Sequence, residues 1–121
     1  MTSVKTLAEL IARGDSNAAA IRAPGQEALT FDGLRMLCAS TLGVLNSAGI
    51  GRGDRVVIVL PNGPEMASAF IAVACTATAA PLNPAYRAEE FEFYISDLNA
   101  KAVIVIAGDE TPAISAANNL N

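Results

Sequence analysis

The chain has 121 residues, enough for one domain over residues 1–121, and a formal net charge of −4 that leaves no basic cluster. It contains no histidine and no tryptophan, which excludes a histidine-based nucleophile pair and an imidazole zinc site. The acidic balance also argues against binding nucleic acid, because such proteins need a positively charged face for the phosphates.

The N-terminal segment predicts a short helix followed by a hairpin. Apolar side chains follow helical spacing within residues 4–13, and Gly14 is a stop signal for that helix. Between residues 18 and 31, two short apolar runs flank Pro24 and Gly25, which are typical of a tight turn. We therefore expect two antiparallel strands here.

A second, longer helix is predicted over residues 32–48. Asp32 stands where an N-cap residue is expected, and Gly49 can close the helix in the left-handed conformation. The apolar face of this helix is predicted to consist of Leu34, Leu37, Cys38, Thr41, Leu42 and Leu45.

The rest of the chain alternates between strand and helix patterns. Residues 55–60 and 101–106 are continuous apolar runs after the charged residue that begins each, which is typical of strands buried on both faces of a parallel sheet, and a shorter strand is predicted over residues 79–82. Helical patterns fill the intervals at residues 64–78 and 88–98.

This order predicts an α/β fold, with a three-layer parallel βαβαβ sheet preceded by an antiparallel N-terminal hairpin. Right-handed crossovers are expected to place the helices at 64–78 and 88–98 on one face of the sheet, which leaves the helix at 32–48 to cover the other. Residues 108–121 are expected to form a polar, weakly helical and poorly defined tail.

Cysteine usage and hydropathy bear on the compartment. Cys38 and Cys75 fall within apolar helical patterns and are interpreted as buried free thiols, which favours a reducing, cytoplasmic location. Residues 66–82 carry no charge, but this stretch is shorter than the roughly 20 residues that a membrane span needs and contains Pro81. No membrane span is predicted.

The local motifs give no catalytic or metal site. The glycines of residues 49–54 follow a helix and precede a strand, the reverse of a dinucleotide-binding turn. At Pro61–Pro64 two prolines remove amide donors, and Glu65 would repel a phosphate, so this stretch is interpreted as a structural connector. The three glutamates within residues 89–92 cannot all converge on one ion, so they are interpreted as a solvated helix face.

Three ordered segments carry a family resemblance. They are Gly51–Val56 leading into Leu60–Glu65, then Ala80–Pro84, then Glu89–Glu90 leading to Lys101–Val105. Together they resemble the start of an AMP-forming acyl-CoA synthetase of the adenylate-forming superfamily, in the branch that holds 4-coumarate–CoA ligases, fatty acyl-CoA synthetases and oxalyl-CoA synthetase. The resemblance covers nearly all of residues 5–107.

The resemblance implies a parent enzyme that uses ATP, Mg²⁺ and coenzyme A. Such an enzyme converts a carboxylic acid to an acyl-adenylate with release of pyrophosphate, and then transfers the acyl group to coenzyme A. In similar enzymes the phosphate loop, the nucleotide contacts and the catalytic lysine come later in the chain. We therefore expect this N-terminal subdomain to hold no catalytic residue, metal ligand or bound cofactor, and to be inactive when isolated.

The same resemblance singles out one residue and several partners. Similar enzymes place a basic side chain near the nucleotide phosphates of coenzyme A, just after an Asn-Pro loop, and this implies Arg87 as a coenzyme A contact. From its chemistry alone, Arg87 is interpreted as a surface charge. The expected partners are the remainder of the enzyme and, through exposed apolar surface, a second copy of the fragment.

Two other functions fit the same pattern. The chain could be a free-standing α/β interaction module that binds a partner through an exposed sheet edge. It could instead belong to an adenylation domain that serves a carrier protein in place of coenzyme A. The sequence does not identify the carboxylic acid substrate.

Overall fold

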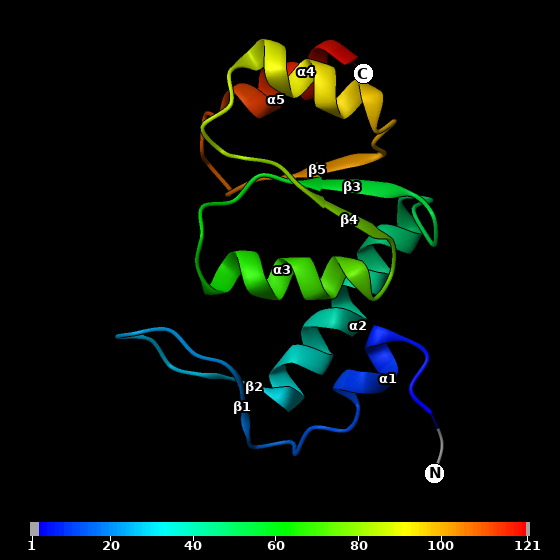
Figure 1. The fold of residues 1–121 in the computed structure, drawn as a ribbon, viewed down its shortest axis with the longest axis vertical. Coiled ribbons are helices and arrows are strands. Elements are labelled where there is room, and N and C mark those ends of the chain that lie inside the picture. The colour runs from blue at the N-terminus through cyan, green and yellow to red at the C-terminus, as the bar shows by residue number, and fades with distance from the viewer. Residues whose placement is uncertain (1–2, 121) are drawn as a thin grey trace.

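The apolar β-branched runs of the sequence form the central layer of the fold. The computed structural model describes residues 3–120 (Figure 1). The helices are α1 (Leu7–Ile11), α2 (Phe31–Ser47), α3 (Pro64–Ala74), α4 (Ala88–Asp97) and α5 (Pro112–Leu120). The strands are β1 (Ala19–Ile21), β2 (Leu29–Thr30), β3 (Arg55–Ile58), β4 (Thr78–Pro81) and β5 (Ala102–Ile104).

Strands β1 and β2 pair antiparallel, and β3 pairs in parallel with β4 on one side and β5 on the other. The predicted α/β fold, with its parallel sheet and N-terminal hairpin, is confirmed. In the register, Val56 of β3 lies between Ala79 of β4 and Ala102 of β5. The central position of β3 explains why its three apolar side chains, Val56, Val57 and Ile58, are the most deeply buried in the sheet.

The helices cover the two faces of the sheet in pairs. Helices α2 and α3 lie on one face, and α4 and α5 lie on the other (Figure 1). The prediction that the helices at 64–78 and 88–98 share a face is therefore wrong. The connection from β3 to β4 moves one way along the sheet and the connection from β4 to β5 moves back past β3. Two right-handed crossovers that run in opposite directions place their helices on opposite faces.

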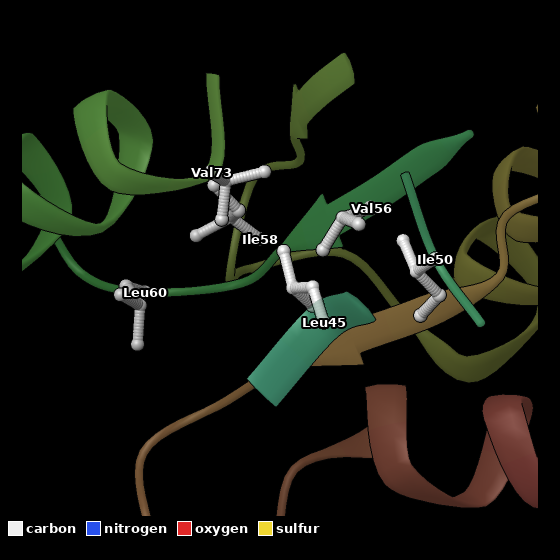
Figure 2. Close-up of a cluster of buried hydrophobic side chains, with 6 residues drawn as sticks. All are labelled: Leu45, Ile50, Val56, Ile58, Leu60 and Val73. Carbon is white, nitrogen blue, oxygen red and sulfur yellow. The ribbon is translucent and has the colours of Figure 1, made fainter. Parts of the chain in front are cut away.

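Alternate side chains of β3 divide the core into two clusters. Val56 and Ile58 point toward α2 and α3, whereas Val57 points toward α4 and α5 and packs in the same cluster as Phe91 and Ala116. Figure 2 shows the first cluster, formed by Leu45, Ile50, Val56, Ile58, Leu60 and Val73. Each cluster combines one face of the sheet with helix side chains that lie far away in the sequence.

Helix α2 begins at Phe31, one residue before the predicted start. Its N-cap is Thr30, whose Oγ1 accepts a hydrogen bond from the Gly33 N–H at 3.1 Å, so the prediction of Asp32 as the cap is wrong. Thr30 keeps the extended backbone of β2, which an N-cap requires, while Asp32 lies in the first turn and complements the helix dipole. At the other end Gly49 has a φ of +79°, as predicted for a left-handed helix stop.

Helix α5 lies within residues 108–121, where a weakly helical tail is expected. Ala113 and Ala116 are fully buried between α5 and the sheet, because their small side chains let the helix approach closely. Oε1 of Glu92 accepts a hydrogen bond of 2.8 Å from Nδ2 of Asn119. Glu92 thus faces α5, which corrects the interpretation that all three glutamates of residues 89–92 lie on a purely solvated face. Asn121 lies outside the described residues.

Two apolar side chains predicted to face inward are exposed instead. They are Leu37 and Leu42 of α2, with exposed fractions of 36% and 44%. Only the C-terminal part of α2 reaches the sheet, while its N-terminal part lies against α1 and the hairpin (Figure 1). Part of its apolar stripe therefore has no cover within residues 3–120.

None of the helices described over that range is both long enough and apolar enough to cross a membrane.

Candidate functional site

The loops that follow β3 and β4 meet at the carboxyl edge of the sheet and border a cavity of about 610 Å³. Its walls include the apolar side chains of Leu60, Met66 and Leu82 and the amides of Asn62 and Asn83. In sheets of this kind, ligands bind at the carboxyl edge where neighbouring strands send their helices to opposite faces. Strands β3 and β4 meet that condition, so this edge is the candidate functional site.

The backbone of these two loops is held by the ends of the strands. The parallel hydrogen bonding continues past β3 and β4, because the Val59 N–H donates to the Ile104 oxygen and the Leu82 N–H donates to the Ile58 oxygen, both at 2.9 Å. Prolines then follow in each loop and cannot donate to a further ladder bond. Oδ1 of Asn83 accepts the Ala85 N–H at 2.9 Å, which closes a local turn.

The cavity is uncharged. None of the residues that line it has an ionisable side chain. At the nearby N-terminus of α3, Pro64 lacks an amide donor and the Glu65 carboxylate lies beside Gly63, where an anion would otherwise approach. Over residues 3–120 no cluster of three or more histidine, cysteine, aspartate or glutamate side chains could hold a metal ion. The cavity can therefore hold and orient a group through apolar contact and amide hydrogen bonds, but it supplies no acid, base or nucleophile of its own.

Arg87, the predicted coenzyme A contact, lies outside the lining of this cavity. It is the N-cap residue of α4, and its backbone N–H donates to Oε1 of Glu90 at 3.1 Å. Its guanidinium Nε stands 3.6 Å from the same carboxylate oxygen, and the Arg87 side chain is 80% exposed. An exposed ion pair of this kind contributes little to stability, so Arg87 can exchange Glu90 for another anion at small cost.

Tyr86 anchors the loop that carries Arg87. Its ring stacks on Tyr94 with centroids 5.2 Å apart and meets Phe91 edge to face at 5.8 Å. Partial burial, and then the neighbouring Tyr94, raise the pKa of Tyr86 above its usual value, so the neutral phenol is favoured. These contacts fix the start of α4, and with it the position of Arg87 relative to the sheet edge.

The structure brings together two segments that carry the family resemblance, Leu60–Glu65 and Ala80–Pro84, whereas Arg87 lies outside the cavity that they border. Sequence reasoning treated the first segment as a connector and missed that Asn62 and Asn83 border a common cavity. The signal was present, because each asparagine follows a parallel strand, and the carboxyl ends of such strands meet at one edge.

Comparison with known proteins identifies what this chain is similar to. The AMP-binding enzyme family matches residues 9–121. The chain is 41% identical over 107 residues to a protein named probable CoA ligase CCL9 from Humulus lupulus, and this match covers 88% of this chain and 20% of that protein. It is 46% identical over 78 residues to an oxalate–CoA ligase of Arabidopsis thaliana, and this match covers 64% of this chain and 15% of that protein.

A solved structure agrees with these sequence relatives. The inhibitor-bound N-terminal domain of FACL13 from Mycobacterium tuberculosis has a TM-score of 0.75 and 25% identity to this chain, and the match covers 97% of this chain and 30% of that one. The present chain spans a fifth or less of the length of the two curated relatives. The similarity therefore extends over nearly the whole chain but only a small part of each relative.

Proposed function

Because the chain belongs to the AMP-binding enzyme family, we propose that it works as the N-terminal part of an ATP-dependent acyl-CoA synthetase. The observation that carries this proposal is the family match over residues 9–121. The two relatives named as CoA ligases support the choice of acid–thiol ligase within that family.

The proposed reaction belongs to the whole enzyme. A carboxylic acid and ATP would give an acyl-adenylate and pyrophosphate with the help of Mg²⁺, and the acyl group would then pass to the thiol of coenzyme A. A transferring phosphoryl group needs cations and hydrogen-bond donors placed around its developing charge. The carboxyl-edge cavity offers only two amides and no charge, so its residues do not fit a triphosphate or a magnesium ion.

The role proposed for this chain is therefore structural. It would frame one wall of the adenylation domain through the carboxyl edge of its sheet, and the remainder of the enzyme would supply the phosphate loop and the catalytic lysine. We propose a cytoplasmic location for the parent enzyme. The acyl substrate would be chosen by residues outside this chain.

The isolated chain is expected to release no pyrophosphate above background when it is given ATP, Mg²⁺, coenzyme A and a mixture of short and long carboxylic acids. The longer protein that contains this segment is expected to turn over at least one of these acids under the same conditions. A coupled pyrophosphate assay measures both. Clear turnover by the 121-residue chain would overturn the structural role.

Arg87 is proposed to contact a phosphate of coenzyme A in the full-length enzyme. Replacing Arg87 with alanine is expected to raise the KM for coenzyme A by about tenfold, because one charged hydrogen bond contributes on the order of 1.5 kcal/mol. The KM for ATP should stay the same. The matched control is Arg52→Ala, which removes an exposed arginine from the turn before β3, at the opposite edge of the sheet. Equal KM values for coenzyme A in Arg87→Ala and the parent enzyme would remove this assignment.

One observation favours a second candidate function. In the three-stranded sheet of the described residues, β4 and β5 each have one side without a partner strand. Such edges can accept a strand from another protein, as expected for a free-standing interaction module. Sequencing the gene downstream of codon 121 separates the two functions. A Ser/Thr/Gly-rich loop followed by lysine supports the ligase, and an immediate stop codon supports the module.

A further inference from the structure

The two cysteines of the chain lie far apart in the sequence but meet in the fold. Cys38 lies in α2 and Cys75 is the C-cap residue of α3, and both border a cavity of about 230 Å³ between α1, α2 and α3. Each side chain is half-buried, so both thiols at the border of this cavity are within reach of small solutes.

The backbone holds both cysteines in place. Cys75 keeps helical angles, and its N–H donates to the Ile71 oxygen at 3.1 Å. Helices α2 and α3 pack together, and both contribute to the buried cluster that contains Leu45 and Val73. The two cysteines are therefore held on packed helices at the border of one cavity, where a covalent S–S bond of about 2.05 Å would join α2 to α3.

We propose that Cys38 and Cys75 form a site for a reversible intramolecular disulfide that links α2 to α3. The oxidant is a low-molecular-weight disulfide such as glutathione disulfide. A thiolate of the pair attacks one sulfur of the oxidant and expels one glutathione thiolate, which leaves a mixed disulfide. The second cysteine then attacks the protein sulfur of that mixed disulfide and expels the second glutathione. Two cysteine thiols are oxidised and one glutathione disulfide is reduced to two glutathione molecules.

The surroundings of Cys38 and Cys75 set the rate at which the disulfide forms. Burial, and then the hydrogen bond and charge of Cys38, raise the pKa of Cys75 from its usual value near 9.0 to about 11. Cys75 is therefore a neutral thiol at pH 7 and a slow nucleophile. The charged or titratable neighbours that border the cavity are Arg35 of α2 and the two thiols, while α1 contributes only Ala8 and Ile11. The guanidinium of Arg35 is hydrogen-bonded to the backbone oxygens of residues 11 and 14, at 3.0 and 2.8 Å.

Disulfide formation is thus expected to be slow near neutral pH and to accelerate as the pH rises toward 11, because the fraction of Cys75 thiolate grows over that range. The rate increases with pH because the pKa of Cys75 is raised above its usual value. Cys75 would be the thiol whose ionisation limits the rate, whichever cysteine receives glutathione first.

The test uses the full chain in its reduced form, incubated with glutathione disulfide at about pH 8 and about pH 9.5 and followed by intact mass. The monomer mass is expected to fall by about 2 Da and maleimide labelling to be lost at both cysteines, faster at the higher pH. The thermal unfolding midpoint should rise by roughly 10 °C, because the link closes a long loop in the unfolded chain. Dithiothreitol should reverse all three changes.

The matched controls are Cys38→Ser and Cys75→Ser, which keep the size of the side chain and remove one partner. Each is expected to stop at the mixed disulfide, about 305 Da heavier, with no rise of the midpoint. The proposal is overturned if the unsubstituted chain also stops with glutathione on both thiols, if it remains fully reduced at both pH values, or if it forms only disulfide-linked dimers.

Discussion

Replacing Phe91 with alanine is expected to lower the free energy of unfolding by about 3–5 kcal/mol. Phe91 is fully buried and is the largest side chain in the cluster between the sheet and helices α4 and α5. Its removal loses hydrophobic burial and leaves a cavity that the neighbouring helices fill only in part. A typical domain is stable by only about 5–15 kcal/mol, so the variant should unfold at a much lower urea concentration.

Phe93→Ala is the matched control, because it makes the same chemical change two residues along the same helix. Phe93 is 62% exposed, and its main ring contact is with Tyr94, at a centroid distance of 5.3 Å. The expected loss is within about 0.5 kcal/mol, as for other surface substitutions. Similar losses for the two variants, measured by urea unfolding followed by circular dichroism, would contradict the orientation of α4 on the sheet.

Replacing Ala116 with aspartate is expected to lower the free energy of unfolding by about 3 kcal/mol or more. Ala116 is fully buried against the face of the sheet that carries Val57 of β3 and, just after that strand, Val59. A carboxylate there would lose its hydration without an opposite charge, and it needs more space than alanine leaves. Circular dichroism and urea unfolding report both the loss of helix and the loss of stability.

Ser115→Asp introduces the same charge at the preceding position of α5, where the side chain is exposed. This control should lose no more than about 0.5 kcal/mol. The pair of variants tests whether α5 is a docked helix or the tail that the sequence suggests. If α5 were a loosely attached tail, neither substitution would change the unfolding transition.

The succession of elements was predictable from local patterns, but their arrangement was not. The run at residues 55–60 predicts a buried strand, because every side chain in it is apolar after Arg55. Which face each helix covers depends on where the next strand pairs. The order β4-β3-β5 arises from long-range pairing that leaves no periodic signal in the helices at 64–78 and 88–98. The face assignment therefore failed although the crossover rule behind it holds.

Two errors of detail have related causes. Asp32 was the better N-cap by residue type, but Thr30 ends a strand with the extended backbone that a cap needs, and that pairing is tertiary information. The docking of α5 was not predicted, because residues 112–120 lack a strong apolar stripe. The inward-facing side chains are the small ones of Ala113 and Ala116, which pack closely against the sheet but add little to a hydrophobic pattern.

The candidate site was predictable only in part. The resemblance carried by Ala80–Pro84 directed attention to Arg87, whereas the cavity at the carboxyl edge requires the loop after β3 to lie beside the loop after β4. Asn62 and Asn83 are brought together by that adjacency. A pairing of two strands thus creates the site, and no motif within either loop does so alone.

The central position of β3 also orders the events of folding. Fewer residues separate β3 from β4 than separate β3 from β5. Pairing β3 with β4 therefore costs less chain entropy than pairing β3 with β5. During synthesis β3 can therefore pair with β4, with α3 packed against them, while β5 is still being made. Until α4 and α5 dock, Val57 and Val59 stay exposed to solvent. The nascent chain then exposes an apolar face of the sheet that chaperones and other unfolded chains can bind.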